Sequence, residues 1–197
     1  MRRLCLGGSF NPIHVGHVIC ARFAAESAGF SGVRLIPTAS NPHKPDAELA
    51  PADLRIAMLH AAVAGDPFFV VDARETRRSG ISFTFDTASA LIDAGELKPV
   101  SWLIGTDLLP RLHSWYRFHD LHNILSFIVM KRAGGPVSFE SCDAQVRSLC
   151  ALIVDVPQIE ISSTLIRNRI AKGLPIDGLV HPAVQKIIEV NGLYRTN

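Results

Sequence analysis

The stretch Leu6-Gly7-Gly8-Ser9-Phe10-Asn11-Pro12-Ile13-His14-Val15-Gly16-His17 decides the fold of this chain. Its start completes Arg3-Leu4-Cys5-Leu6, a mostly apolar run typical of a buried strand, and it leads into residues 15–28, where apolar side chains recur at helical spacing. Gly7 and Gly8 allow positive φ angles and a close approach of a ligand to the backbone. The helix N-terminus that follows carries unpaired N–H groups and a partial positive charge. The turn therefore predicts a phosphate site between a strand and a helix.

Two histidines, His14 and His17, stand three residues apart in the first turn of that helix. Side chains at i and i+3 share one helix face, so both imidazoles should point toward whatever occupies the turn. There they could donate hydrogen bonds to charge that develops on a phosphate during a reaction. Two surface histidines, or two transition-metal ligands, would produce the same spacing, although no third or fourth ligand follows at a convincing distance. Neither the dinucleotide-binding glycine pattern nor a P-loop is present.

Residues 8–17 resemble the G-[ST]-F-[DN]-P-x-H-x-G-H signature of the HxGH nucleotidyltransferases. A later stretch, Ile161-Ser162-Ser163-Thr164-Leu165-Ile166-Arg167, resembles the second signature of that superfamily, and Gly192-Leu193-Tyr194 resembles the end of one of its families, the bacterial nicotinate mononucleotide adenylyltransferases. The resemblance spans nearly the whole chain. It implies adenylyl transfer from ATP to nicotinate mononucleotide, giving nicotinate adenine dinucleotide and pyrophosphate, a step of NAD biosynthesis.

Strand and helix patterns alternate along the chain. Strands are predicted near 33–37, 68–71, 100–104, 127–130 and 151–154, with helices near 51–62, 81–94, 163–172 and 182–190. This order predicts an α/β fold, a Rossmann-like open parallel sheet with helices on both faces, as in nucleotidyltransferases. We expect a single domain over 1–197, with a C-terminal helical part from about 161. Residues 138–150 indicate no particular secondary structure.

The composition indicates an ordinary globular chain. It has 197 residues, 48% hydrophobic and 19% charged, with a net charge of +2. This charge is too small to indicate a nucleic-acid or membrane surface, and no run of about eighteen apolar residues is present. The four cysteines, Cys5, Cys20, Cys142 and Cys150, have no CxxC spacing, so we expect reduced, structural thiols and a cytoplasmic protein. The sequence is compatible with a homo-oligomer.

On the ATP side, the resemblance implies that Lys44, in Pro42-His43-Lys44-Pro45, binds the phosphates. Asp107 follows a predicted strand, where it could accept hydrogen bonds from ribose. On local grounds Lys44 could equally be a surface lysine and Asp107 a helix cap. The predicted ATP-binding set is Gly7, Gly8, Ser9, Phe10, Gly105, Asp107, Ile161, Ser162 and Ser163.

On the acceptor side, the resemblance implies contacts from Ser82 and Thr84 and stacking of Trp115 on the pyridine ring. Arg132 is a candidate for the phosphate of the mononucleotide, because arginine favours bidentate phosphate contacts. Alternatives are open here too: Ser82 or Thr84 could simply cap a helix, and Trp115 could be a core residue. Where this family usually has proline after the arginine, the chain has Ala133.

The implied catalytic set is His14, His17, Lys44 and Arg167. The histidines would stabilise the reacting phosphate, while Lys44 and Arg167 would hold the leaving phosphates. Mg²⁺ would be bound mainly through ATP phosphates, without a dedicated protein site. Nicotinamide mononucleotide or phosphopantetheine are alternative acceptors, and the preference for the acid rests on resemblance alone. A non-catalytic nucleotide-binding regulator is the alternative from another class, but it would not need leaving-group contacts.

Overall fold

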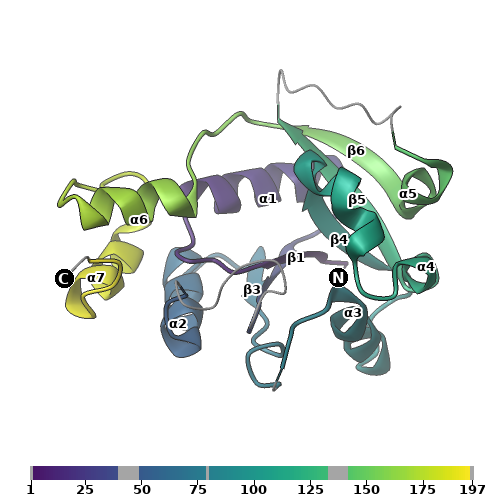
Figure 1. Ribbon diagram of the computed structural model, residues 1–197, viewed down its shortest axis with the longest axis horizontal. Helices are drawn as coiled ribbons and strands as arrows, with labels where there is room; N and C mark the ends of the chain where they lie inside the picture. The colour runs from purple at the N-terminus through teal and green to yellow at the C-terminus, as the bar shows by residue number, and fades with distance from the viewer. Residues whose placement is uncertain (1, 40–48, 79, 133–141, 196–197) are drawn as a thin grey trace.

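Six parallel strands form one open sheet in the computed structural model, which describes residues 2–39, 49–78, 80–132 and 142–195 (Figure 1). The strands are β1 (Leu4–Gly8), β2 (Val33–Pro37), β3 (Phe69–Val71), β4 (Val100–Gly105), β5 (Leu125–Arg132) and β6 (Cys150–Val156). Their order is β3-β2-β1-β4-β5-β6, and every pairing is parallel. The predicted Rossmann-like sheet is thus confirmed.

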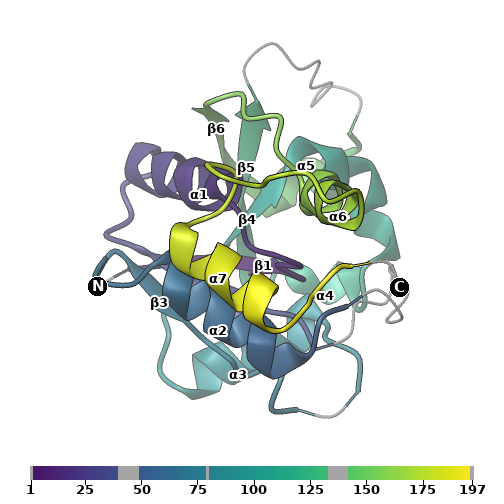
Figure 2. The ribbon, with the colours of Figure 1, turned by 90° about the vertical axis from the view of Figure 1, so that its left-hand side faces the viewer.

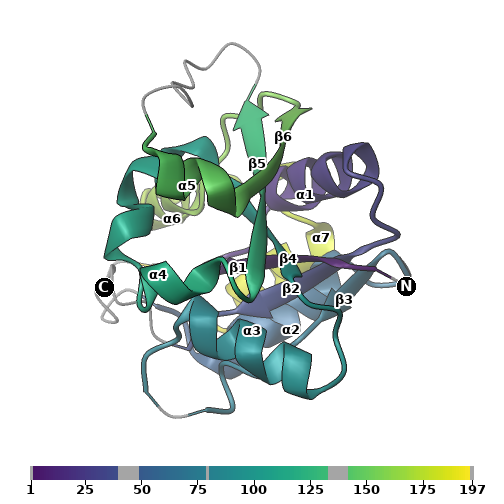
Figure 3. The ribbon, with the colours of Figure 1, turned by 90° about the vertical axis from the view of Figure 1, so that its right-hand side faces the viewer.

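Helices cover both faces of the sheet because side chains alternate along each buried strand. In β1, Leu4 and Leu6 pack into one core and Cys5 into the other. The first core takes helices α1 (Val15–Ser27), α2 (Ala52–Ala62), α6 (Ser163–Ala171) and α7 (Pro182–Val190). The second takes α3 (Thr84–Asp93), the 3₁₀ helix η2 (Thr106–Ser114), α4 (Phe118–Leu121) and α5 (Ala144–Leu149). Figure 3 shows α4 and α5 on one side of β5 and α1 on the other.

The C-terminal helices lie together at one end of the molecule (Figure 1), and α7 runs alongside α2 (Figure 2). Val184 and Ile188 on α7 are buried in the same core as Met58 and Leu59 on α2. The end of the chain is therefore anchored next to the helix that follows β2.

Several boundaries differ from the sequence prediction. β5 extends from Leu125 to Arg132 because its start pairs with β4 and its residues 127–132 pair with β6, which extends from Cys150 to Val156. Helix α3 begins only at Thr84, with Phe83 at its N-cap, so neither Ser82 nor Thr84 is the cap. The segment without a clear pattern contains α5, whose N-cap Asp143 accepts a hydrogen bond from Val146 N at 2.9 Å. All four cysteines are free. Among the helices of the described residues, none is long and apolar enough to cross a membrane.

Candidate active site

The sheet reverses its winding between β1 and β4, which are neighbours at its centre. From β1 the chain winds toward β2 and β3, and from β4 toward β5 and β6. At such a point the loops leaving the two strands diverge, and a crevice opens beyond their carboxyl ends. Gly8 ends β1 and Gly105 ends β4, so two of the predicted ATP-binding positions stand at this crevice.

Two glycines at these ends lie close to neighbouring side chains. A Cβ on Gly7 would lie 2.8 Å from Cζ2 of Trp102, a buried side chain of β4. A Cβ on Gly105 would collide with Oδ1 of Asp107, an exposed residue in the first turn of η2. The packing of Trp102 therefore requires glycine at position 7, whereas the exposed carboxylate of Asp107 could move away from a Cβ at position 105.

The loop after β1 turns sharply over Phe10. Phe10 has φ of 45°, a left-handed conformation that is uncommon for a bulky residue and indicates a constrained turn. Its ring is 2% exposed and lies edge-on to His17, with ring centroids 5.2 Å apart. Since this side chain is buried, only the backbone of Phe10 can face a nucleotide.

The two histidines meet in the first turn of α1, as their spacing predicted. Their rings stack with centroids 3.7 Å apart and planes at 30°. His14 is the N-cap residue of α1, and its backbone N donates to Nδ1 of His17 at 3.3 Å. Because Nδ1 of His17 accepts this bond, the neutral ring carries its proton on Nε2 and presents an N–H donor. The pair thus combines imidazole donors with the positive end of a helix.

The second motif docks directly on the first. Ser162 caps α6 by accepting from Leu165 N at 3.1 Å, and Ser163 Oγ donates to the carbonyl of Pro12 at 2.8 Å. Arg167 Nη1 donates to the carbonyl of Asn11 at 3.0 Å. The two signatures, more than 140 residues apart in sequence, therefore form one surface. In it the N-terminus of α6 and the guanidinium of Arg167 adjoin residues 9–14 between β1 and α1, which we call the histidine loop.

The predicted acceptor residues lie around the start of α3 and the end of η2. Ser82 is buried, and its Oγ accepts from Ala39 N at 3.0 Å, so it links this loop to the loop after β2. Thr84 is the first residue of α3. Trp115 is half-buried and lies edge-on to Phe127, with ring centroids 5.7 Å apart. Lys44 lies outside the described residues; Arg132 ends β5, and its side chain is likewise outside them.

Sequence reasoning missed the buried polar groups beneath the loop. Arg55 on α2 is 1% exposed and donates to the carbonyls of Ser9 and Thr38, both at 2.8 Å, and of Ala50 at 3.0 Å. An arginine within the apolar run of α2 was the available signal. Arg55 thus ties the loop after β1 to the loop after β2 on this side of the crevice.

Glu75 was missed as well. It is buried and accepts from Thr87 Oγ1 at 2.6 Å. Burial raises the pKa of the Glu75 carboxyl above its ordinary value, although hydrogen bonds from Thr87 and Ser82 and the charge of Arg78 lower it. The carboxyl thus fixes the loop that carries Ser82.

Comparisons with known proteins agree with this geometry. The cytidylyltransferase-like family model matches residues 5–169. A probable nicotinate-nucleotide adenylyltransferase of Yersinia enterocolitica is 37% identical, with 96% of this chain and 93% of the relative covered. The nicotinate-nucleotide adenylyltransferase of Bacillus subtilis is 34% identical, with 96% of each chain covered. The chain belongs to the nicotinate-nucleotide adenylyltransferase family, among the cytidylyltransferase-like proteins.

Solved structures support the fold. The nicotinic acid mononucleotide adenylyltransferase of Plasmodium falciparum, complexed with NaAD, superposes with a TM-score of 0.75 over 98% of each chain, at 18% identity. Family and fold were therefore predicted correctly from the two signatures and the alternation of strands and helices.

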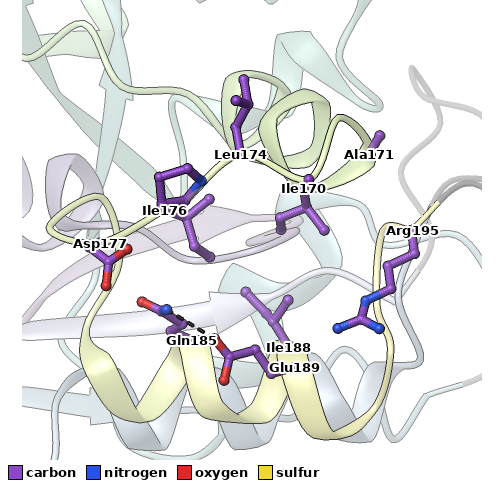
Figure 4. A pocket seen from close by; sticks show the side chains of 11 residues that line it. Ile170, Ala171, Leu174, Ile176, Asp177, Gln185, Ile188, Glu189 and Arg195 are labelled. Atoms are coloured by element: carbon purple, nitrogen blue, oxygen red, sulfur yellow. Dashed lines mark hydrogen bonds between the residues drawn. The ribbon is translucent and has the colours of Figure 1, made fainter.

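A separate cavity of about 580 Å³ lies between α6 and α7 (Figure 4). Ile170, Ile176 and Ile188 contribute apolar side chains to it, and Gln185 donates to Glu189 at 2.9 Å along α7. None of the residues that line it belongs to the predicted site. The predicted site therefore lies at the strand ends, helix N-termini and histidines, and not in this cavity. Among the described residues, no group of three or more His, Cys, Asp or Glu side chains is placed to hold a metal ion.

Proposed function

We infer that the chain transfers the adenylyl group of ATP to nicotinate mononucleotide, releasing pyrophosphate and forming nicotinate adenine dinucleotide. The observation that carries this function is the family membership over 96% of the chain. The hydrogen-bond donors that suit this reaction lie together where the sheet reverses its winding: the histidine loop is joined there to the segment from Ser163 to Arg167.

The reaction needs alignment and charge stabilisation more than it needs a base. The acceptor phosphate is already a nucleophile: one of its oxygens forms a bond to the α-phosphorus of ATP, and the bond from that phosphorus to the bridging oxygen of the β-phosphate breaks. We propose that His14 and His17 hydrogen-bond the reacting phosphate and the bridging oxygen. Their fixed stack at the N-terminus of α1 would stabilise the extra charge of the pentavalent centre.

The leaving phosphates would be held from the opposite side of the loop. We propose that Arg167 and Lys44 contact the β- and γ-phosphates, with the N–H groups after Ile161, at Ser162 and Ser163, completing an anion site. Arg167 already donates to the Asn11 carbonyl, so its guanidinium is oriented at the edge of the histidine loop. Gly7, Gly8, Ser9 and Phe10 would offer backbone N–H groups, and Gly105 and Asp107 would face the ribose.

The acceptor would lie toward the start of α3. We propose that the backbone at Ser82 and Thr84 meets the ring substituent, that Trp115 stacks on the pyridine ring, and that Arg132 pairs with the phosphate of the mononucleotide. The buried hydroxyl of Ser82 is bound to Ala39 N, which supports a backbone role for this residue over direct hydroxyl contact.

We propose Mg²⁺ as the metal of this reaction, held by the nucleotide and not by the histidines. Imidazole nitrogens are poor ligands for Mg²⁺, which prefers oxygens and retains its waters, so the nucleotide phosphates would supply its ligands. When bound, the ion neutralises part of the phosphate charge. We propose no dedicated protein ligand for it.

An acceptor panel tests the function. Pyrophosphate release from ATP is measured with nicotinate mononucleotide, nicotinamide mononucleotide or phosphopantetheine as the acceptor, and the product is identified by mass. We expect the fastest release with nicotinate mononucleotide. Faster release with the amide or with phosphopantetheine would reassign the acceptor, and ATP binding without release for any of the three would indicate a nucleotide-binding regulator.

A further inference from the structure

The C-terminal turn of the chain reaches the loop of the first motif. The Tyr194 hydroxyl donates to Oδ1 of Asn11 at 2.8 Å, across 183 positions of sequence. The backbone of Tyr194 has φ of 63°, a left-handed conformation that a large side chain adopts only where its surroundings hold it. The contact therefore requires a specific shape of the chain end, which follows α7.

Asn11 is the centre of this contact. It is 4% exposed, and its Oδ1 also accepts from Ala50 N at 3.0 Å. Its carbonyl accepts from Arg167 Nη1 at 3.0 Å. One residue of the motif loop thus joins the loop after β2, the second motif and the chain end, three positions before His14.

The neighbouring carbonyls are held in the same way. Arg55 donates to the Ser9 carbonyl at 2.8 Å, and Ser163 donates to the Pro12 carbonyl at 2.8 Å. Burial raises the pKa of the Tyr194 hydroxyl above its usual range, while the nearby charges of Arg167 and Arg55 lower it by less. The hydroxyl therefore remains a protonated donor at neutral pH, beside the two arginines that hold the loop.

We propose that Tyr194 is a positioning residue for adenylyl transfer: its hydroxyl fixes the Asn11 side chain and thereby holds the loop that leads to His14 and His17 at the start of α1. This inference rests on the proposed function. Donors that are already in place need no reorganisation during the reaction, so the contact affects turnover more than substrate binding. Tyr194 acts through Asn11 and does not touch the reacting atoms.

Tyr194→Phe tests this role, because it keeps the ring and removes only the hydroxyl. We expect kcat to fall about fivefold, corresponding to about 1 kcal/mol, with the KM values for ATP and acceptor changed less than about twofold. Ile187→Val is the matched control: it removes one methylene from a half-buried residue of α7 that packs on the same core. It should lower the unfolding temperature and leave kcat unchanged.

A double-mutant cycle removes Asn11 Oδ1, the acceptor of the bond from Tyr194. In an Asn11→Ala chain, Tyr194→Phe should cause no further fall in kcat, because the two residues act as one unit. An unchanged kcat in Tyr194→Phe, an equal fall in Ile187→Val, or an equal fall in the Asn11→Ala background would each overturn the positioning role. A parent chain that forms no dinucleotide would overturn the proposed function first, so the two failures are distinguishable.

Discussion

His17→Ala removes a donor that the structure places at the start of α1. Loss of one fixed hydrogen-bond donor to developing phosphate charge raises the barrier by about 3 kcal/mol, or roughly a hundredfold in kcat. The substitution also removes the Nδ1 acceptor for His14 N, a bond of 3.3 Å, and the ring stacked at 3.7 Å on His14. Loss of this bond should cost about 1 kcal/mol of folding stability. We therefore expect kcat to fall at least about a hundredfold, while ATP still binds.

His181 provides a control that separates the loss of turnover from the loss of a hydrogen bond at a helix start. His181 caps α7, and its Nδ1 accepts from Ala183 N at 3.1 Å. His181→Ala should therefore lose a comparable amount of stability with little change in kcat. Turnover is measured as pyrophosphate release, ATP binding by calorimetry without acceptor, and stability by thermal unfolding. Near-normal turnover in His17→Ala, or an equal fall in His181→Ala, would refute the assigned role.

Three further predictions follow from the glycine turn, the buried carboxyl and the metal. Gly7→Ala should destabilise the fold by about 1–3 kcal/mol, because its Cβ would lie 2.8 Å from Trp102. Trp102→Phe should relieve part of this cost in the double variant. Free energies of urea unfolding that are strictly additive for the two substitutions would contradict the clash. The pKa of Glu75 is raised from 4.5, so the native state binds its proton more readily than the unfolded state and loses stability as pH rises above that value. Glu75→Gln, which cannot ionise, should thus gain stability relative to the parent as pH rises above 4.5, and a pH-independent difference in urea unfolding would argue against a buried, ionising carboxyl. Chelation with EDTA should abolish turnover and Mg²⁺ alone should restore it fully; recovery that needs a transition metal would make His14 and His17 metal ligands.

The sheet and its first crossover were predictable because their signals are local. Leu4, Cys5 and Leu6 are apolar without interruption, as in a strand buried on both faces, and the helix that follows was predicted to begin at Val15, where α1 begins. The lengths of β5 and β6 were not predictable in this way. Strand ends depend on pairing with neighbouring strands. β5 lies between β4 and β6 and pairs with each of them over a different part of its length.

The site was predictable where chemistry is written in short motifs. His14 and His17 are neighbours on one helix turn, and Ser162 of the second motif caps α6. Groups whose partners are distant gave little or no signal. Ser82 was one of two possible caps of the helix that follows it, yet its hydroxyl accepts from Ala39 N, 43 positions away. Tyr194 is 183 positions from Asn11, so the contact becomes visible only once the fold brings α7 beside α2.

We propose that the mononucleotide phosphate attacks the α-phosphorus of ATP at the histidine loop. This attack is tested with nicotinate mononucleotide that carries ¹⁸O in its phosphate oxygens, unlabelled ATP, and mass analysis of both products. We predict that all of the label is retained in nicotinate adenine dinucleotide and that the pyrophosphate is unlabelled. Label in the pyrophosphate, or cleavage of ATP without a labelled dinucleotide, would contradict the account.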